Sequence, residues 1–422
     1  MIRQGGTVVW AWMVAAAVSH AAVAPPVTRS TWLSEPSPGR LQPDRSFVYQ
    51  PAAAAEWSFS HHPYLTRFGG RLIAMWSNAR RDEDSSGQRV AWATSEDGKA
   101  WSPESTLVAA PQDETGEPMV LTAAGFHEHD GELIAYFGVY RQDRSGTRLG
   151  YVSTRDGAAW SAPRFLNVAV TPNDEPRRLA SGKLMICGHL AFPTTSDLSG
   201  RDGWVMQGLH PTPRAGGMIE DNPATFWTAQ RELGWEAALC EGSFVQLADG
   251  TIRMMLRATG DGYKGRLWQT ESTDDGVSWT TPRITEFPDN DSKFQFGRLS
   301  DGRYFYLGTP QPEPRWKRSP LVFSLSSDGI VFDRHWVIAD EPYEMRTPGR
   351  YKGGEYGYAH LQEHDGRMEI ICSRQKEAVE FLSMPIPAMT PEARDMVDPS
   401  RHDVPGPGLG AASVGPDPDD RP

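Results

Sequence analysis

The chain has 422 residues, of which 39% are hydrophobic, and a formal net charge of −12. Because phosphate binding needs a basic surface, an acidic chain without a run of Lys and Arg is a poor candidate for binding nucleic acid. The 41 glycines and 34 prolines are spread along the chain, which suits many short strands joined by turns.

Residues 1–24 have the pattern of a secretory signal peptide. Arg3 precedes a short apolar run at 7–18, and residues 19–21 offer small side chains for cleavage. A membrane anchor is the alternative, but the run is too short to span a bilayer comfortably, and no later run approaches the roughly 20 residues that a spanning helix needs. We therefore expect a secreted or periplasmic protein with no membrane span after signal removal.

Three cysteines, Cys187, Cys240 and Cys372, each lie in or beside an apolar, strand-like run. With an odd number of cysteines we do not expect a disulfide framework, even in an exported chain, although one disulfide between two of the three is the alternative. There is no C-x-x-C pattern for a metal. We expect buried, free thiols.

An Asp-Gly turn followed, three residues after the glycine, by an aromatic residue occurs four times. The copies lie at 94–101, 153–160, 272–279 and 326–332. In such a turn the aspartate caps amides, the glycine permits positive φ and the aromatic ring packs between strands. The gap between the second and third copies is roughly twice the first gap, which predicts a degenerate copy near residue 215.

Six short apolar runs, each led by glycine, recur out of phase with these turns. They lie at 70–76, 131–137, 182–188, 250–256, 302–308 and 366–372. Repeats of this length hold one four-stranded antiparallel sheet, which is the unit of a β-propeller. We predict an all-β protein with a single propeller over 28–390, six or seven blades, a blade shared by both ends of the chain, and a disordered tail at 391–422.

Adjacent histidines, His61 and His62, precede the first apolar run and are the sharpest candidates for catalysis. Histidine titrates near neutral pH, so one ring could act as general acid or base while the other binds substrate. The alternative is a pair of buried, satisfied histidines in a strand that leads toward the propeller axis.

Other polar side chains next to the runs are candidates for binding substrate. Arg374 and Lys376 follow the last run, where they form either a clamp on a carboxylate or sugar hydroxyls, or an ion-pair network that closes the ring. Further candidates occupy similar places in other repeats: Glu241, Arg257, Lys293, Arg318, Tyr356, Tyr358 and His360. Several basic and acidic groups around one axis suit the binding of an acidic sugar. No spacing selects the carboxylate pair of an ordinary glycosidase.

The Asp-Gly turns resemble the Asp-boxes of the sialidase superfamily, whose pattern is Ser/Thr-x-Asp-x-Gly-x-Thr-Trp. Ser272–Trp279 matches this pattern best, with Asp274, Gly276 and Trp279 in phase. The resemblance implies a propeller and does not by itself imply an enzyme, because Asp-boxes lie away from active sites. A true sialidase is disfavoured, since SHHPYL stands where that family has Phe/Tyr-Arg-Ile-Pro.

Several longer stretches resemble a narrower group of secreted propeller enzymes that act on L-rhamnose linked α-1,4 to glucuronic acid. They include SFSHHPYL, RLIAMWSN, GGEYGYAH and SRQKEAVE, and with others they span residues 57–380. The group includes a seven-bladed rhamnosidase that relies on histidine, and lyases that use His with Arg and Tyr. The resemblance implies seven blades, catalysis by His61 or His62, and Arg374 and Lys376 as contacts to substrate.

Two mechanisms on this linkage stay open from the sequence. Hydrolysis needs an acid and a base for the leaving oxygen and water, whereas β-elimination needs removal of the uronate C5 proton with the carboxylate neutralised. We expect a hydrolase, with the lyase, a sialidase-like hydrolase and a non-catalytic glycan-binding propeller as alternatives. The expected partner is an acidic oligosaccharide or polysaccharide, bound by a monomer without cofactor. A structural calcium ion is conceivable but no loop has its ligand spacing.

Overall fold

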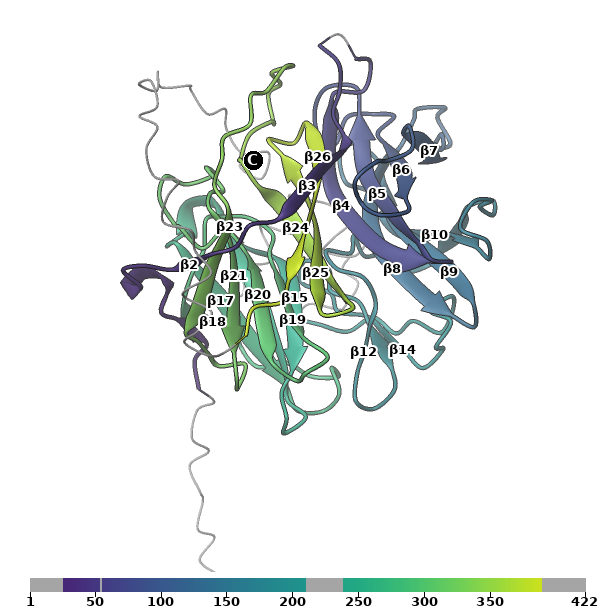
Figure 1. Ribbon diagram of the computed structural model, residues 1–422. Coiled ribbons are helices and arrows are strands. Elements are labelled where there is room, and N and C mark those ends of the chain that lie inside the picture. Colours follow the sequence, from purple (N-terminus) through teal and green to yellow (C-terminus); the bar gives the residue numbers. More distant parts are fainter. Residues whose placement is uncertain (1–25, 54, 210–237, 389–422) are drawn as a thin grey trace, which may run out of the picture.

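The computed structural model describes residues 26–53, 55–209 and 238–388, and these are almost entirely strands and turns (Figure 1). The two helical elements in those ranges are single 3₁₀ turns, at Trp32–Ser34 and Gly260–Gly262. In the part of the chain so described, no helix has the length and apolar character needed to cross a bilayer. The predicted signal peptide at 1–24 and tail at 391–422 lie outside the described residues.

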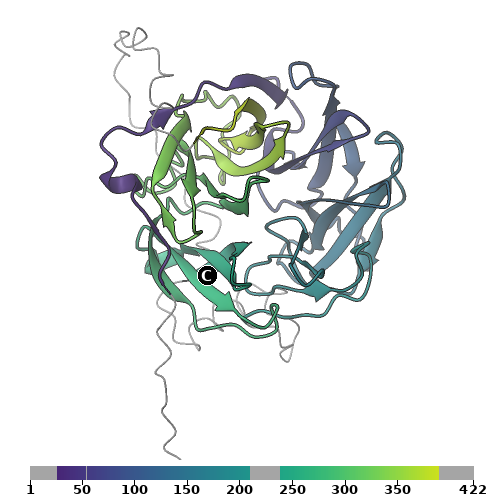
Figure 2. The same cartoon turned by 60° about the horizontal axis from the view of Figure 1, so that its bottom comes forward.

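The described strands form six sheets, which surround a central axis as the blades of a propeller (Figure 2). Blade 1 contains β4 (Phe59–Phe68), β5 (Arg71–Ala79), β6 (Arg89–Ser95) and β7 (Ser105–Val108). Blade 2 contains β8 (Val120–His129), β9 (Glu132–Tyr140), β10 (Arg148–Thr154) and β11 (Arg164–Leu166). Blade 3 is short, with β12 (Arg177–Arg178), β13 (Leu184–Met185) and β14 (Thr194–Thr195).

The other three blades complete the ring. Blade 4 contains β15 (Ala238–Gln246), β16 (Ile252–Thr259), β17 (Arg266–Ser272) and β18 (Arg283–Pro288). Blade 5 contains β19 (Gln295–Arg298), β20 (Tyr304–Gly308), β21 (Leu321–Ser326) and β23 (Arg334–Ala339). Blade 6 contains β24 (Gly357–His364), β25 (Arg367–Arg374), β26 (Ala378–Pro385) and β3 (Asp44–Tyr49).

Each apolar run in the sequence falls on the second strand of a blade, and all but a few residues of these strands are buried. The core is therefore divided into layers between neighbouring blades, because a central sheet packs on both faces. Tyr64 and Met75 of blade 1 share a cluster with Leu121 and Phe137 of blade 2, for example, and similar clusters join the other neighbours. This arrangement confirms the all-β propeller predicted from the repeats.

Both ends of the described chain meet in blade 6, as the sequence predicted for one blade. The N-terminal strand β3 pairs antiparallel with the C-terminal strand β26, with Phe47 opposite Glu380. An ion pair between Arg45 and Glu380, at 2.9 Å, strengthens this closure. The described ranges hold six sheets, the smaller of the two expected counts.

The segment before β3 fastens the outer edges of blades 4 and 5. β1 (Arg29–Ser30) pairs in parallel with β18 and with β22 (Val331–Phe332), and β2 (Gly39–Arg40) pairs in parallel with β23. Because β1 pairs with a strand of each blade, it adds backbone pairing across the outer side of blades 4 and 5.

The Asp-Gly turns connect the third and fourth strands of their blades and have the predicted capping chemistry. Oδ1 of Asp156, for example, accepts the amides of residues 158 and 159 at 2.8 Å. A turn with similar capping chemistry lies at 197–204 in blade 3. Its Asp197 carboxylate accepts the amides of residues 199, 201 and 202, and the Trp204 indole donates to the carbonyl of Gly200. The position near 215, where the spacing predicted a degenerate copy, lies outside the described residues.

Candidate active site

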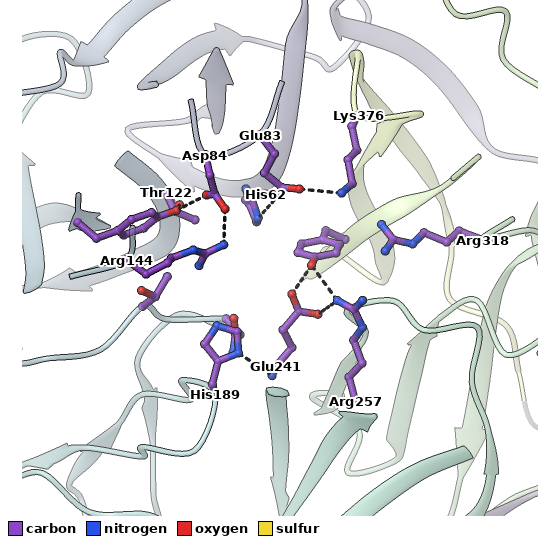
Figure 3. Close-up of a pocket in the computed structure, with 14 residues that line it drawn as sticks. His62, Glu83, Asp84, Thr122, Arg144, His189, Glu241, Arg257, Arg318 and Lys376 are labelled. Carbon is purple, nitrogen blue, oxygen red and sulfur yellow. Dashed lines mark hydrogen bonds and ion pairs between the residues drawn. The ribbon is translucent and has the colours of Figure 1, made fainter. Parts of the chain in front are cut away.

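A polar pocket lies where the six blades converge on the axis, and Figure 3 shows side chains from every blade pointing into it. The lining residues are His62, Glu83, Asp84, Thr122, Tyr140, Arg144, Thr171, Asn173, His189, Glu241, Arg257, Arg318, Tyr358 and Lys376. Both acidic and basic side chains line the pocket, and most of the lining residues are buried. Such a set suits a polar, charged ligand more than an apolar one.

Three inner strands direct a side chain at the pocket through the same local distortion. The pairing register shifts at His62 in β4, at Glu241 in β15 and at Tyr358 in β24. These residues have φ values of +51°, +44° and +54°, which are uncommon and costly for residues other than glycine. A β-bulge of this kind bends a strand and re-aims one side chain, so the position of these three groups is built into the sheet.

Tyr358, Glu241 and Arg257 form a hydrogen-bonded cluster in one wall of the pocket. The Tyr358 hydroxyl donates to Oε1 of Glu241, and Nη1 of Arg257 donates to Oε2 of Glu241 at 2.8 Å and to the Tyr358 oxygen at 3.2 Å. Burial alone would raise the pKa of Glu241, but Arg257 outweighs it and holds that pKa below its usual value. The carboxylate can therefore take the phenol proton, which is how a base activates a nucleophile.

Arg257 is fixed from the side away from Glu241 by the buried carboxylate of Asp291. Nε of Arg257 lies 2.5 Å from Oδ1 of Asp291, and Oδ2 of Asp291 accepts from Arg315, Trp316 and Thr259. A guanidinium with both ends held in this way is preorganised, so it presents its charge to the pocket with little loss of freedom.

Arg318 contributes a guanidinium whose hydrogen-bonding capacity is only partly used. Its Nη2 donates to the carbonyl of Asp291 at 3.1 Å, while Nε and Nη1 are buried without a protein partner. The charge lies 5.6 Å from the centre of the Tyr358 ring. Unpaired buried donors are costly, so these N–H groups point to a bound anion or ordered water as their missing partner.

The opposite wall holds His62, Glu83 and Lys376. Nε2 of His62 lies 3.3 Å from Oε1 of Glu83, and Nζ of Lys376 donates to Oε2 of Glu83 at 2.7 Å. Burial raises the pKa of Glu83, but the Lys376 ammonium and the two neighbouring histidines together outweigh it, so the pKa lies well below its usual range. Glu83 is therefore a carboxylate that faces an imidazole.

His61 lies behind the pocket and does not line it. Its ring is fully buried, with Nδ1 2.7 Å from Oγ of Ser373 and its centroid 4.0 Å from that of Tyr358. Burial, and then the neighbouring His62, lower the pKa of His61 well below the ordinary value. The structure thus separates the two histidines, with His62 in the pocket and His61 supporting Tyr358 from behind.

Lys293 and His360 lie in a second polar cluster that does not line the pocket. Nζ of Lys293 donates to the Tyr64 hydroxyl at 3.0 Å, and Nε2 of His360 lies 2.8 Å from Oε2 of Glu175. Burial lowers the pKa of Lys293 and raises that of Asp174 to about 6. These charges neutralise one another inside the ring.

Arg374 and Tyr356 lie in the network that closes the ring. Nη1 of Arg374 pairs with Glu380 at 2.6 Å, and its other nitrogens donate to the carbonyls of Glu355 and Glu341. The Tyr356 hydroxyl donates to the carbonyl of Glu341 at 3.0 Å. The sequence left two interpretations of the stretch after β25, a substrate-binding clamp and an ion-pair network that closes the ring. Arg374 belongs to the network, whereas Lys376 lines the pocket.

The structure therefore brings six of the eleven candidates to the pocket, and it adds residues that the sequence did not single out. Glu83 and Asp84 follow β5, Tyr140 is the last residue of β9, and Arg144 follows β9. Oδ1 of Asp84 accepts from the Tyr140 hydroxyl at 2.7 Å, and its other oxygen pairs with Arg144. All four residues lie at or within five residues of the end of a blade's second strand, so the position of the apolar runs was the signal that could have found them.

Two groups of side chains have ligand-type atoms within 4.8 Å of one another. They are His61, His62 and Glu83, and Asp174, Glu175 and His360. An ammonium already accompanies each group, Lys376 in the first and Lys293 in the second. These cations offset the negative charge that a divalent metal requires, so we assign neither group as a metal site.

The sequence matches the model of the BNR repeat-like domain family over residues 70–370. No curated protein matches the chain. Among solved structures, a protein titled as a sialidase is 17% identical with a TM-score of 0.56, over 83% of this chain and 33% of that one. Trypanosoma rangeli sialidase in complex with sialic acid is 13% identical with a TM-score of 0.55, over 82% of this chain and 59% of that one.

A third similar structure, a protein of unknown function from Dyadobacter fermentans, is 12% identical with a TM-score of 0.56 and is covered over its whole length. At sequence identities this low, the structural similarity establishes a shared propeller fold only, and the chemistry has to be inferred from the residues of the site. The chain spans a third of the first sialidase and about three fifths of the trypanosomal one.

Proposed function

The chain belongs to the BNR repeat-like domain family, and we propose that it is a carbohydrate-active enzyme that cleaves a glycosidic bond beside a carboxylate-bearing sugar. One observation carries this proposal: the Tyr358 hydroxyl donates to Glu241 in the wall of a pocket that is also lined by two arginines, Arg257 and Arg318. A sialidase-like propeller is a common scaffold for acting on glycans or binding them, and this constellation favours catalysis.

Tyr358 is proposed as the nucleophile. A phenol reacts poorly until a base takes its proton, and Glu241 is hydrogen-bonded to it and kept ionised by Arg257. In the first step the phenol oxygen bonds to the anomeric carbon, its proton passes to Glu241, and the bond to the leaving oxygen breaks. Water then displaces the tyrosine, and the Tyr358 oxygen recovers its proton from Glu241. Glycosidases of the sialidase type use a tyrosine nucleophile, which makes the step chemically sound.

The two arginines are proposed to bind the carboxylate of the substrate. Arg318 has unpartnered N–H groups in the pocket, and Arg257 is held in place by Asp291. A guanidinium matches a carboxylate in charge and in hydrogen-bond geometry, and burial strengthens the pairing.

We further propose that the acidic sugar is glucuronate carrying α-1,4-linked L-rhamnose, on plant-type polysaccharides reached by secretion. The support is the resemblance of residues 57–380 to enzymes of that linkage, together with the carboxylate-binding arginines. His62, the histidine that lines the pocket, is the proposed acid and base of the reaction. Hydrolysis is favoured because Tyr358 already has a base in Glu241.

A lyase on the same bond is the second candidate. The His62 ring lies 5.0 Å from the Tyr358 ring, so one group could remove the C5 proton of a uronate while the arginines neutralise its carboxylate. Elimination would leave an unsaturated uronate, which hydrolysis cannot form.

Incubation with gum arabic, with products separated by chromatography and followed in the ultraviolet, tests these proposals. We expect free rhamnose without the absorbance of an unsaturated uronate, and no product from the Glu241→Gln variant. Absorbance of the unsaturated product would establish the lyase instead. A sialylated oligosaccharide serves as the second substrate. Release of sialic acid, with no product from gum arabic, would show that the substrate is a sialylated glycan and not rhamnosyl-glucuronate. Binding without any product would identify a glycan-binding propeller.

A further inference from the structure

The imidazole of His62 has a partner on each nitrogen. Nδ1 lies 3.1 Å from Oγ of Ser77, and Nε2 lies 3.3 Å from Oε1 of Glu83. The Ser77 oxygen accepts the amide of Ala123 at 2.9 Å, and its second lone pair can accept Nδ1–H. With the proton of the neutral ring on Nδ1, Nε2 is the nitrogen that gains and loses a proton, on the side of Glu83.

Glu83 in turn is shared between His62 and Lys376. Nζ of Lys376 lies 2.7 Å from the second carboxylate oxygen, and both side chains are nearly buried. Lys376 is held in a strained position on the turn between β25 and β26, with φ of +55°, and its carbonyl accepts the amide of Ser60 in β4 at 3.0 Å. The turn of blade 6 therefore aims one ammonium at an acid of blade 1.

We propose that His62, Glu83 and Lys376 form a charge-linked triad in which Lys376 is a positioning residue. It holds the Glu83 carboxylate on Nε2 of His62 and opposes the pull of that carboxylate on the imidazole proton. The proposal rests on the proposed function, because it gives His62 the proton transfers that complement Tyr358.

The triad serves both steps of hydrolysis. As the glycosidic bond breaks, Nε2 of the imidazolium gives its proton to the leaving oxygen. As water attacks the glycosyl–tyrosine bond, the same nitrogen takes a proton from the water, so the ring returns to its starting state. Glu83 alone would bind the imidazolium too tightly, and Lys376 weakens that hold through the shared carboxylate.

Other charged or titratable groups surround His62, and none of them changes in the test described next. They are His61 on the same strand, Tyr358 on β24, Glu241 and Arg257 on blade 4, Arg318 before β21, Asp84 after β5 and Arg144 after β9. A difference between variants therefore reports on Glu83 and Lys376.

The test is an NMR titration of the histidine ring signals in the full chain, with His62 identified by the signal lost in His62→Gln. We expect Lys376→Met to raise the titration midpoint of His62 by about one pH unit, because the carboxylate is then unopposed. Glu83→Gln should lower the midpoint, because only the ammonium remains. Lys183→Met removes a 2.8 Å lysine–aspartate pair outside the pocket and should leave the midpoint unchanged.

Opposite shifts in the two variants support the triad, and an unchanged midpoint in both overturns it. If one variant does not fold, the sign of the shift in the other decides. The pH profile of cleavage is the second readout, and its limb assigned to His62 should move with the midpoint. If the His62 titration midpoint shifts as expected but the protein cleaves no glycan, the triad is supported and the proposed function is refuted.

Discussion

At the scale of single residues, two tyrosines only two residues apart have different tasks. Tyr358 occupies a bulge and gives its hydroxyl to Glu241 in the pocket, whereas Tyr356 gives its hydroxyl to Glu341 in the network that closes the ring. Both are buried aromatic residues at the N-terminal end of β24, so composition and burial alone do not distinguish them. The hydrogen-bond partners of the two hydroxyl groups distinguish them.

Replacing Tyr358 by Phe removes the proposed nucleophile with little change of shape. We expect kcat on the acidic glycan to fall at least about 100-fold, because the phenol oxygen has no substitute. Tyr356→Phe is the matched control, and it should keep kcat while losing about 1 kcal/mol of stability with its hydrogen bond. Steady-state kinetics and urea unfolding of both variants measure this, and equal losses of activity would contradict the assignment.

At the scale of elements, the loop before β24 supports Arg318. A Cβ atom placed on Gly354 would come 2.6 Å from Cδ of Arg318, and Gly354 has φ of +74°. The amide of Tyr356 donates to the carbonyl of Arg318 at 3.0 Å, which ties the two segments together. The absence of a side chain at residue 354 therefore lets the guanidinium lie where the pocket needs it.

Gly354→Ala should displace Arg318 and weaken binding of the substrate carboxylate. We expect KM for the acidic glycan to rise about 10-fold or more, because a displaced guanidinium loses a charge-assisted contact. Gly366→Ala is a close control, since that glycine has φ of +71° but no atom within 4 Å of its Cβ position. It should share the backbone strain of about 1 kcal/mol and keep KM. A similar KM for both variants would show that Gly354 does not position Arg318.

At the scale of the whole molecule, buried ionisable groups make stability depend on pH. Burial lowers the pKa of four histidines, to about 4 in two of them: His61, His127, His189 and His335. Burial acts the other way on two acids, raising the pKa of Asp174 to about 6 and that of Asp289 to about 8. The histidines outnumber the acids, so they set the sign of the effect.

The free energy of unfolding should fall as pH is lowered from 7 to 5. Below the ordinary histidine pKa of 6.5 the unfolded chain binds protons that the folded histidines do not, while the two acids bind protons mainly in the folded state. Each net proton contributes about 1.4 kcal/mol per pH unit. Urea unfolding at pH 7, 6 and 5 measures the slope, and His335→Gln should flatten it. Stability that rises toward pH 5 would mean that the acids dominate.

Much of the fold followed from the sequence because a propeller repeats its signals. The apolar runs mark the second strand of each blade, and the Asp-Gly turns mark the connection between the third and fourth strands. The turn at 197–204 did not match the repeat pattern, because its tryptophan directly follows the Asp202-Gly203 pair and does not stand three residues after the glycine.

The pocket was only partly predictable. Lys376 and Arg374 are two residues apart in one polar stretch, and only the geometry of a turn with positive φ sends Lys376 to the pocket. His61 and His62 looked equivalent, but the bulge at His62 turns one ring toward the axis and leaves the other behind Tyr358. Bulges are set by pairing between strands, which a one-dimensional pattern does not contain.

The closure of blade 6 has a consequence for how the protein is made. Arg45 and Glu380, which join β3 to β26, are 335 residues apart, so a ribosome releases one of these strands long before the other. Until translation reaches β26, β3 has no neighbour in its sheet and the growing ring remains open. Contacts of such high sequence separation form late and slowly. β26, the last strand in the described part of the chain, is therefore the one that turns a row of blades into a closed ring.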